Sequence, residues 1–254
     1  LFAEQGYGDT LQFARYATCF KRRGAKTILA APKSLCELLK GVSGIDAVVA
    51  QSGRLPEVDY WVPLLDIPLY VEANERPTPP YLKVGAENQS PWRDKLGSKM
   101  QFRIGVVWEG SSTHPHARWH KIPSAYFERL ARQVSAEWIA LQPGMSGDAA
   151  KRPWRSIPKL DDTHAFLDTA AILCHLDLVI TADTALAHLA GALNIPTWVC
   201  LCAVPDWRWG KSGATTEWYK SLRLFRQSNL GVWDPVFSQI HEALMTELGA
   251  FPLL

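Results

Sequence analysis

The chain has 254 residues, 47% of them hydrophobic and 20% charged, and its formal net charge is +2. This composition is typical of a globular protein that buries a core without disulfides, and so small a charge does not indicate a nucleic-acid partner. The five cysteines are scattered without zinc-ligand spacing, no apolar stretch reaches the ~18 residues of a membrane span, and Leu1 opens the chain without the charged start of a signal peptide. We therefore expect a cytoplasmic protein with reduced thiols and no membrane span.

The first part of the chain alternates strand-like and helix-like stretches. We predict strands at 1–3, 27–31 and 46–50, a turn at 6–10, and helices over 11–23, with Gly24 as C-cap, and over 32–40. This rhythm indicates a parallel sheet covered by helices. Residues 56–91 are rich in proline, so we expect loops and short helices there, followed by a linker at 91–99.

A second α/β rhythm follows this linker. We predict strands at 103–108, 137–141, 178–181 and 196–201, and helices at 124–134, 163–175, 184–193 and 235–248. The fold class is therefore α/β, with two Rossmann-like halves facing each other across a cleft. Ligands of such sheets bind at the carboxyl ends of the strands, and three notable segments lie there.

The first segment is the turn E-Q-G-Y-G-D-T at 4–10. Gly6 and Gly8 allow positive φ angles and a close approach of a ligand to the backbone. Asp9 either caps the helix that follows or takes part in chemistry, and Glu4 is the competing carboxylate unless it pins the loop. The spacing G-x-G-x-x-G is absent, which argues against a nicotinamide dinucleotide.

The second segment runs from strand to helix over 181–192. Its small residues let the helix pack close to the sheet, and the amides of Thr184 and Ala185 form an anion site at a helix N-terminus. Asp183 would repel a bare phosphate but could accept hydrogen bonds from sugar hydroxyls. His188 lies one turn beyond Thr184 on the same face, either as a ligand contact or as a buried, hydrogen-bonded histidine.

The third segment, 108–123, follows the first strand of the second half and carries three histidines, Arg118 and Lys121. Cations at the carboxyl end of a strand suit a diphosphate. The histidine spacing lacks a carboxylate or cysteine to complete a metal site, so we expect no metal.

Five segments together resemble the heptosyltransferase-like glycosyltransferases, family 9 in the broad sense, and above all the catalytic domain of bacterial tetratricopeptide-repeat proteins. They are E-Q-G-Y-G-D-T-L-Q-F-A-R-Y at 4–16, G-V-V-W-E-G at 105–110, T-A-D-T-A-L-A-H-L-A-G-A-L at 181–193, P-D-W-R-W at 205–209 and W-Y-K-S-L-R-L-F-R-Q at 218–227. The likeness covers nearly the whole chain.

The resemblance implies a GT-B fold and an inverting, metal-independent transfer of sugar from a nucleotide-diphosphate sugar to a glycan or protein, without a cofactor. It makes Asp9 the base. The donor would be bound by Asp183, Thr184, Ala185, His188 and a cation among Arg118, His120 and Lys121. The acceptor side would be formed by Gly6, Gly8, Thr10 and Gln12. The relatives usually carry R-S-I-P where this chain has H-K-I-P at 120–123, so the choice of cation stays open.

The change of composition near Pro91 and the strand that restarts at Arg103 predict a division of the chain into two domains. Residues 1–95 would form the acceptor-side domain and 96–233 the nucleotide-sugar domain. The resemblance implies that 234–254 form a helix that returns toward the first domain and that tetratricopeptide repeats lie upstream in the full-length protein. Two other functions compete with sugar transfer. One is a catalytically degenerate domain that only holds a nucleotide sugar or scaffolds a partner. The other is a GT-B epimerase, which would release a free sugar and need no acceptor.

Overall fold

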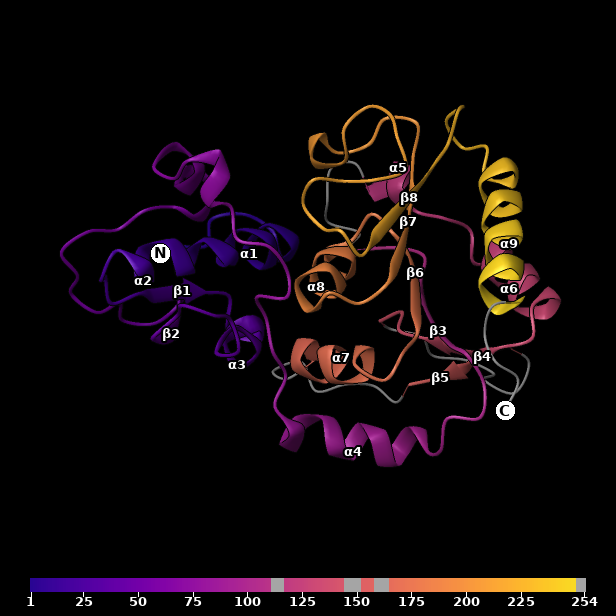
Figure 1. The fold of residues 1–254 in the computed structure, drawn as a ribbon, viewed down its shortest axis with the longest axis horizontal. Helices are drawn as coiled ribbons and strands as arrows, with labels where there is room; N and C mark the ends of the chain where they lie inside the picture. Colours follow the sequence, from indigo (N-terminus) through magenta and orange to yellow (C-terminus); the bar gives the residue numbers. More distant parts are fainter. Residues whose placement is uncertain (111–116, 144–151, 158–164, 250–254) are drawn as a thin grey trace.

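A computed structural model describes residues 1–110, 117–143, 152–157 and 165–249. Within these ranges the strands form two separate parallel sheets (Figure 1). The smaller sheet pairs β1 (Ile28–Ala31) with β2 (Ala47–Ala50). The strand predicted at 1–3 contributes one residue, Phe2, which bridges β1 on one side and Pro63 on the other.

The helix predicted over 11–23 begins earlier and is built of three consecutive pieces. They are α1 (Tyr7–Phe13), the 3-10 turn η1 (Ala14–Tyr16) and α2 (Ala17–Arg22). Gly24 follows with φ +83°, which confirms the predicted glycine at the helix end. The next helical stretch consists of η2 (Lys33–Leu35) and α3 (Cys36–Leu39).

The proline-rich region is as loop-like as expected up to residue 85, with only the short turns η3 (Leu64–Leu69) and η4 (Ala73–Glu75). The predicted linker at 91–99 is wrong, because α4 (Ala86–Leu96) runs through Pro91 and across the predicted boundary at 95. An interior proline costs a helix about 3 kcal/mol. Burial offsets this cost here, since Trp92 is buried and its indole Nε1 donates to Asp168 Oδ1 at 2.8 Å.

The larger sheet has the order β5-β4-β3-β6-β7-β8. Its strands are β3 (Arg103–Val107), β4 (Glu137–Ala140), β5 (Arg155–Ser156), β6 (Leu178–Ala182), β7 (Thr197–Leu201) and β8 (Leu222–Arg226). Four of these were predicted, whereas β5 and β8 were not. The chain order reverses between β3 and β6, so this is the point at which a sheet of this kind opens a ligand site.

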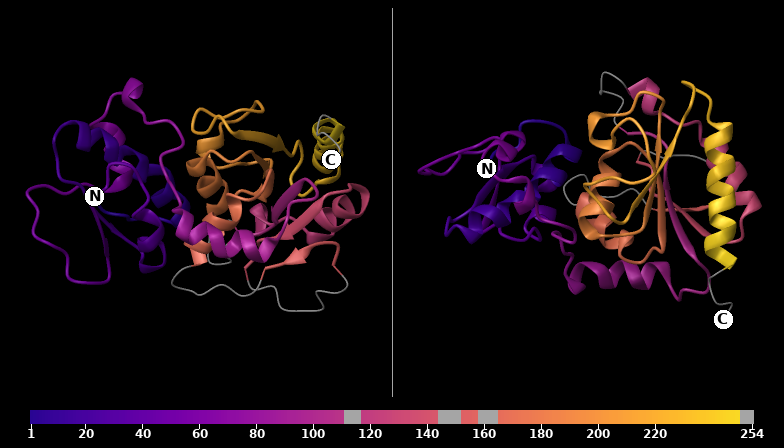
Figure 2. Two further views of the ribbon diagram at one scale, coloured as in Figure 1. Left: turned by 60° about the horizontal axis from the view of Figure 1, so that its bottom comes forward. Right: turned by 45° about the horizontal axis from the view of Figure 1, so that its top comes forward.

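Helices cover both faces of the larger sheet (Figures 1 and 2). On one face lie α7 (Ala165–Leu173) and α8 (Ala185–Leu193), with α4 against α7. On the other lie α6 (Ser124–Gln133) and α9 (Asp234–Gly249). Two short helical segments, α5 (Ala117–His120) and η6 (Trp207–Trp209), sit in the connections. No helix within the described ranges is long and apolar enough to cross a membrane.

We predicted that the closing helix returns toward the first domain, and over its described length it does not. Over its described length α9 packs against α6 and β8, on the side of the molecule away from β1 and β2 (Figure 1). The reason lies in its apolar residues, which are buried in the core on this face of the sheet; the ring of Phe237 lies 5.0 Å from that of Phe127 on α6. At its first residue, Asp234 accepts hydrogen bonds from Tyr126 and Arg129.

The two halves of the chain meet through helices. The first half packs α1 against α8 and α3 against α7, and one hydrophobic core runs through both halves. Arg15 of η1 spans this junction, because it donates to the Trp218 carbonyl at 3.0 Å and its guanidinium lies 4.7 Å from the rings of Tyr81 and Tyr219. That the halves are separate domains with a ligand cleft between them stays a prediction.

Candidate functional site

The chain leaves β6 at Asp183 and turns at once into α8. Thr184 is the N-cap of this helix, and its Oγ1 accepts a hydrogen bond from the Leu186 amide at 3.2 Å. Gly191 allows a close contact with Tyr219, which precedes β8, since a Cβ atom at this position would lie 2.4 Å from the Tyr219 ring. Thr184 and Ala185, the residues of the predicted anion site, stand at the N-terminus of a nine-residue helix, where amides and dipole favour negative charge.

His188 is a buried, hydrogen-bonded histidine. It is 6% exposed, its Nδ1 lies 3.0 Å from the Tyr219 hydroxyl, and its ring stacks on Trp209 with centroids 5.2 Å apart. Burial, reinforced by the charges of Arg208 and Arg15, lowers its pKa to about 3. His188 is therefore neutral at physiological pH and offers a diphosphate no positive charge.

Among the described histidines, His120 has surroundings that favour a charge. Its Nδ1 lies 3.4 Å from Asp183 Oδ2, and this hydrogen bond raises the pKa of His120. The departure from R-S-I-P thus places a protonatable side chain beside the start of α8. Lys121 instead pairs with Glu109 at 2.5 Å. Arg118 belongs to α5, but its side chain lies outside the described residues.

The sequence analysis did not single out Gln142 as a site residue, although it lies two residues after the end of β4, at the same edge of the sheet. Its Oε1 accepts from the amides of Trp108 and Glu109, both at 3.1 Å, and its Nε2 donates to the Glu109 carbonyl. These three bonds fix the backbone that leaves β3. A Cβ atom on Gly110 would lie 3.4 Å from Thr184 Cγ2, so this backbone passes directly beside the start of α8.

The G-Y-G-D segment is the first turn of α1 rather than a loop before it. Gly6 has φ −70°, and neither Gly6 nor Gly8 has a positive φ, so the prediction of left-handed glycines is wrong. Gly8 is needed for close packing instead. A Cβ atom there would lie 2.8 Å from His188 Cδ2 and 3.6 Å from the Ala185 Cα. The first turns of α1 and α8 are therefore in direct contact.

Asp9 is held at this contact. Asp9 is not the N-cap that the sequence suggested, because Gly6 is the N-cap of α1 and Asp9 stands in its first turn. Asp9 Oδ2 reaches back to accept from the Gly6 amide at 2.9 Å, while its Oδ1 pairs with Arg208 of η6. Thr10 donates to the Gly6 carbonyl at 3.1 Å. Glu4 pins the loop, because its carboxylate accepts from the amides of 64 and 65.

Arg208 was also missed as a site residue, although the P-D-W-R-W segment contained it. Its Nε donates to Gln12 Oε1 at 2.6 Å, and Gln12 is fully buried with no partner for its Nε2 among the described residues. The structure thus brings together Asp9, Gln12, the start of α8 and His188. His114 and His116, on which the metal question turned, lie outside the described residues.

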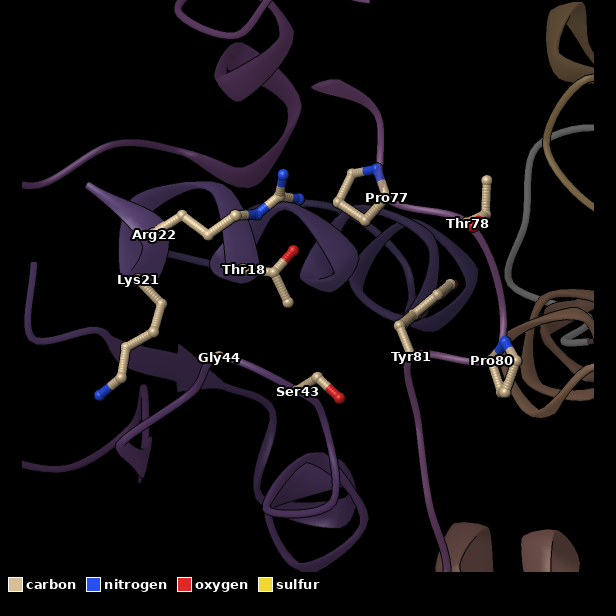
Figure 3. Close-up of a pocket in the computed structure, with 9 residues that line it drawn as sticks. All are labelled: Thr18, Lys21, Arg22, Ser43, Gly44, Pro77, Thr78, Pro80 and Tyr81. Carbon is tan, nitrogen blue, oxygen red and sulfur yellow. The ribbon is translucent and has the colours of Figure 1, made fainter. Parts of the chain in front are cut away.

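A separate cavity of about 420 Å³ lies in the first half (Figure 3). Lys21 and Arg22 of α2 stand on one side of it, and the segment 77–81 runs along another. None of the predicted site residues lines this cavity. It is therefore distinct from the cluster around Asp9 and α8.

No protein-family model matches the chain. Protein FlbA of Caulobacter vibrioides is 25% identical to it over 202 residues, which are 73% of this chain and 33% of FlbA. The chain thus spans about one third of the length of this curated relative.

Solved structures resemble the chain along nearly its whole length. Escherichia coli ADP-heptose LPS heptosyltransferase II gives a TM-score of 0.65 at 12% identity, over 97% of this chain and 98% of that one. A family 9 glycosyltransferase from Veillonella parvula gives 0.63 at 11% identity, over 98% and 97%. E. coli heptosyltransferase WaaC with ADP-2-deoxy-2-fluoro heptose gives 0.58 at 12% identity, over 95% and 98%. The chain therefore shares the α/β fold of these heptosyltransferases and of this family 9 glycosyltransferase.

Proposed function

We propose that this chain is a glycosyltransferase of the GT-B type, which moves a sugar from a nucleotide-diphosphate sugar to a glycan or protein acceptor. The observation that carries the proposal is the contact at Gly8. It sets the turn that bears Asp9 against the first turn of α8, where an anion would bind. A carboxylate and an anion site on facing helices are the two parts that sugar transfer from such a donor requires.

The donor end of the site is built from backbone and one histidine. The amides at Thr184 and Ala185 and the positive end of α8 would hold the diphosphate. His120, whose pKa is raised by the hydrogen bond to Asp183, would add a positive charge on the same side when protonated. His188 would contribute packing and a neutral polar contact, since its pKa of about 3 leaves it uncharged.

At the acceptor end, Asp9 would act as general base. The acceptor hydroxyl would give its proton to Asp9 while its oxygen forms a bond to the anomeric carbon of the sugar. The bond from that carbon to the diphosphate oxygen breaks at the same time, and its electron pair leaves with the nucleoside diphosphate. The start of α8 and His120 would stabilise the developing charge of this leaving group. Attack opposite the leaving group inverts the anomeric centre.

Replacing Asp9 tests this role. Asp9→Asn keeps one side-chain oxygen for the Gly6 amide but gives up the ion pair with Arg208, so the variant should be less stable. The folded variant should still bind nucleoside diphosphate, since the first turn of α8 is unchanged. Transfer should fall by ~10²–10⁴, which is the usual contribution of a general base. Asp94→Asn, on the exposed surface of α4, is the matched control and should transfer normally. Normal transfer by Asp9→Asn would exclude Asp9 as the base.

A nucleotide-sugar-binding domain without turnover is the second candidate. It is favoured by one observation, namely that both carboxylate oxygens of Asp9 are already engaged, by the Gly6 amide and by Arg208. The two functions are separated by a thermal-shift panel of ADP-, UDP-, GDP- and dTDP-sugars followed by assays of sugar transfer. A ligand at 100 times its Kd stabilises a fold by about 2.7 kcal/mol. Such stabilisation with neither transfer nor free sugar indicates the binding domain, and release of an epimerised free sugar without acceptor indicates an epimerase.

A further inference from the structure

The segment P-D-W-R-W at 205–209 forms one short turn that touches both halves of the candidate site. Trp209, at the end of η6, stacks on His188 of α8. Arg208, one residue earlier, reaches the other way and pairs with Asp9 of α1. The proposed chemistry gives this turn no role, yet it connects the carboxylate of one half to the donor helix of the other.

Arg208 is held in place by its own turn before it reaches Asp9. Asp206 Oδ1 accepts from the Arg208 amide at 3.0 Å and from its Nη1 at 2.9 Å. The guanidinium lies 4.5 Å from the ring of Trp207 and 5.8 Å from that of Phe13. The side chain is only 9% exposed. Its orientation is therefore fixed by contacts independent of Asp9.

Two further donors of the guanidinium bond to α1. Nη2 donates to Asp9 Oδ1, and Nε donates to Gln12 Oε1 at 2.6 Å. Asp9 and Gln12 lie three residues apart on one face of the helix, so a single planar group contacts both. With the Gly6 amide on Oδ2, each carboxylate oxygen of Asp9 has one fixed donor.

We propose that Arg208 is the positioning residue of the base, which orients the Asp9 carboxylate toward the acceptor across the contact between the two halves. This inference rests on the proposed function, in which Asp9 takes the proton. A carboxylate rotates freely on its stem unless donors fix it, and a misplacement of about 1 Å can slow a reaction ~10²-fold. Each carboxylate oxygen retains a second lone pair, so the donors now present leave room for the acceptor hydroxyl.

A lysine could not replace this arginine fully. The three bonds use Nε, Nη1 and Nη2 in one plane, which is the geometry of a guanidinium and not of an ammonium group. Arg208→Lys keeps the buried charge and most of the volume but gives up the planar fork. It should therefore transfer sugar about tenfold more slowly, whereas Arg208→Ala should be slowed about 100-fold.

The experiment measures kcat for sugar transfer and the Kd for donor, using the ADP-heptose and UDP-, GDP- and dTDP-hexoses of the panel. Arg208→Ala should lower kcat with a donor Kd within threefold of the wild type. Ethylguanidinium in the buffer should restore part of kcat in Arg208→Ala and none in the Arg208→Ala/Asp9→Asn double variant. The double variant should be no slower than Asp9→Asn alone. Arg76→Gln is the matched control, since Arg76 pairs with Glu217 of the second half, at 3.4 Å, without touching Asp9.

The outcomes separate the inference from the proposed function. An active wild type with an inactive Asp9→Asn and a normal Arg208→Ala would overturn the inference alone. The inference would also be overturned if Arg208→Ala weakened donor binding and left kcat unchanged. It would likewise be overturned if the reductions of kcat in Arg208→Ala and Asp9→Asn multiplied in the double variant. A wild type that binds donors but transfers nothing would overturn the proposed function and with it this role of Arg208. If Arg208→Ala does not fold, Arg208→Lys decides: a kcat equal to that of the wild type overturns the inference.

Discussion

Replacing His188 with asparagine should remove a pH dependence of stability that follows from the burial of the imidazole. In the fold, the pKa of His188 is lowered from 6.5 to about 3. Between these values the unfolded chain holds a proton that the folded chain does not, so the free energy of unfolding rises with pH, by about 1.4 kcal/mol per unit. This stabilisation is fully present above pH 6.5 and is lost as the pH falls toward 3, by roughly 5 kcal/mol in all.

The assay is urea unfolding of wild type and His188→Asn at pH 7.5 and pH 5.5. Asparagine does not titrate, and it keeps a polar atom near the Tyr219 hydroxyl. The variant should be less stable at pH 7.5, because it gives up the stacking on Trp209 and leaves a cavity. The difference in unfolding free energy between the two chains should shrink by about 1.4 kcal/mol at pH 5.5.

The comparison is made at each pH because His120 acts in the opposite sense. The raised pKa of His120 means that its protonation stabilises the fold. This stabilisation is fully present below 6.5, the pKa in the unfolded chain, and is lost as the pH rises through the pKa in the folded chain. Both chains share this contribution, so it cancels in the difference. If the difference in unfolding free energy between the two chains is the same at both pH values, His188 is not neutral in the fold. A positive charge on His188 could then also bind the donor diphosphate, which we have assigned to the α8 amides and His120.

Three further predictions concern the same site. Gly8→Ala should destabilise the fold by about 1–2 kcal/mol in urea unfolding, since its Cβ would lie 2.8 Å from the His188 ring; unchanged stability would contradict the α1–α8 contact. Gly191→Ala should cost about 2 kcal/mol despite the better helix propensity of alanine, because the Tyr219 ring lies 2.4 Å from the new atom, and a rise in Tm would count against this packing. Nucleoside-diphosphate affinity should weaken as the pH rises through the raised pKa of His120, and calorimetry of His120→Asn should show no such step; a step that persists in the variant would assign it to another group.

Local pattern was enough to predict most elements. The short, largely apolar runs that became β3, β4, β6 and β7 are buried on both faces apart from Glu137, which is the pattern of a parallel sheet under helices. The helix start at Thr184 was readable because a hydroxyl residue precedes a run of small helix formers. The predictions failed where a distant contact decided the outcome. The helix α4 runs through Pro91 because Trp92 finds burial and Asp168 on α7, and α9 stays on α6 because its apolar face is occupied there.

In the candidate site, too, some features could be predicted from the local sequence and others depend on distant contacts. The sequence by itself determined which residues stand at the ends of β3 and β6, because strand and turn signals are local. Only the tertiary structure decided their state and their partners. His188 is neutral because burial and two arginines from outside its helix disfavour its charge, whereas His120 favours a proton because Asp183 lies beside it. Asp9 meets Arg208 across 199 residues of chain, a pairing that no local spacing encodes; the docking of α1 on α8 creates it.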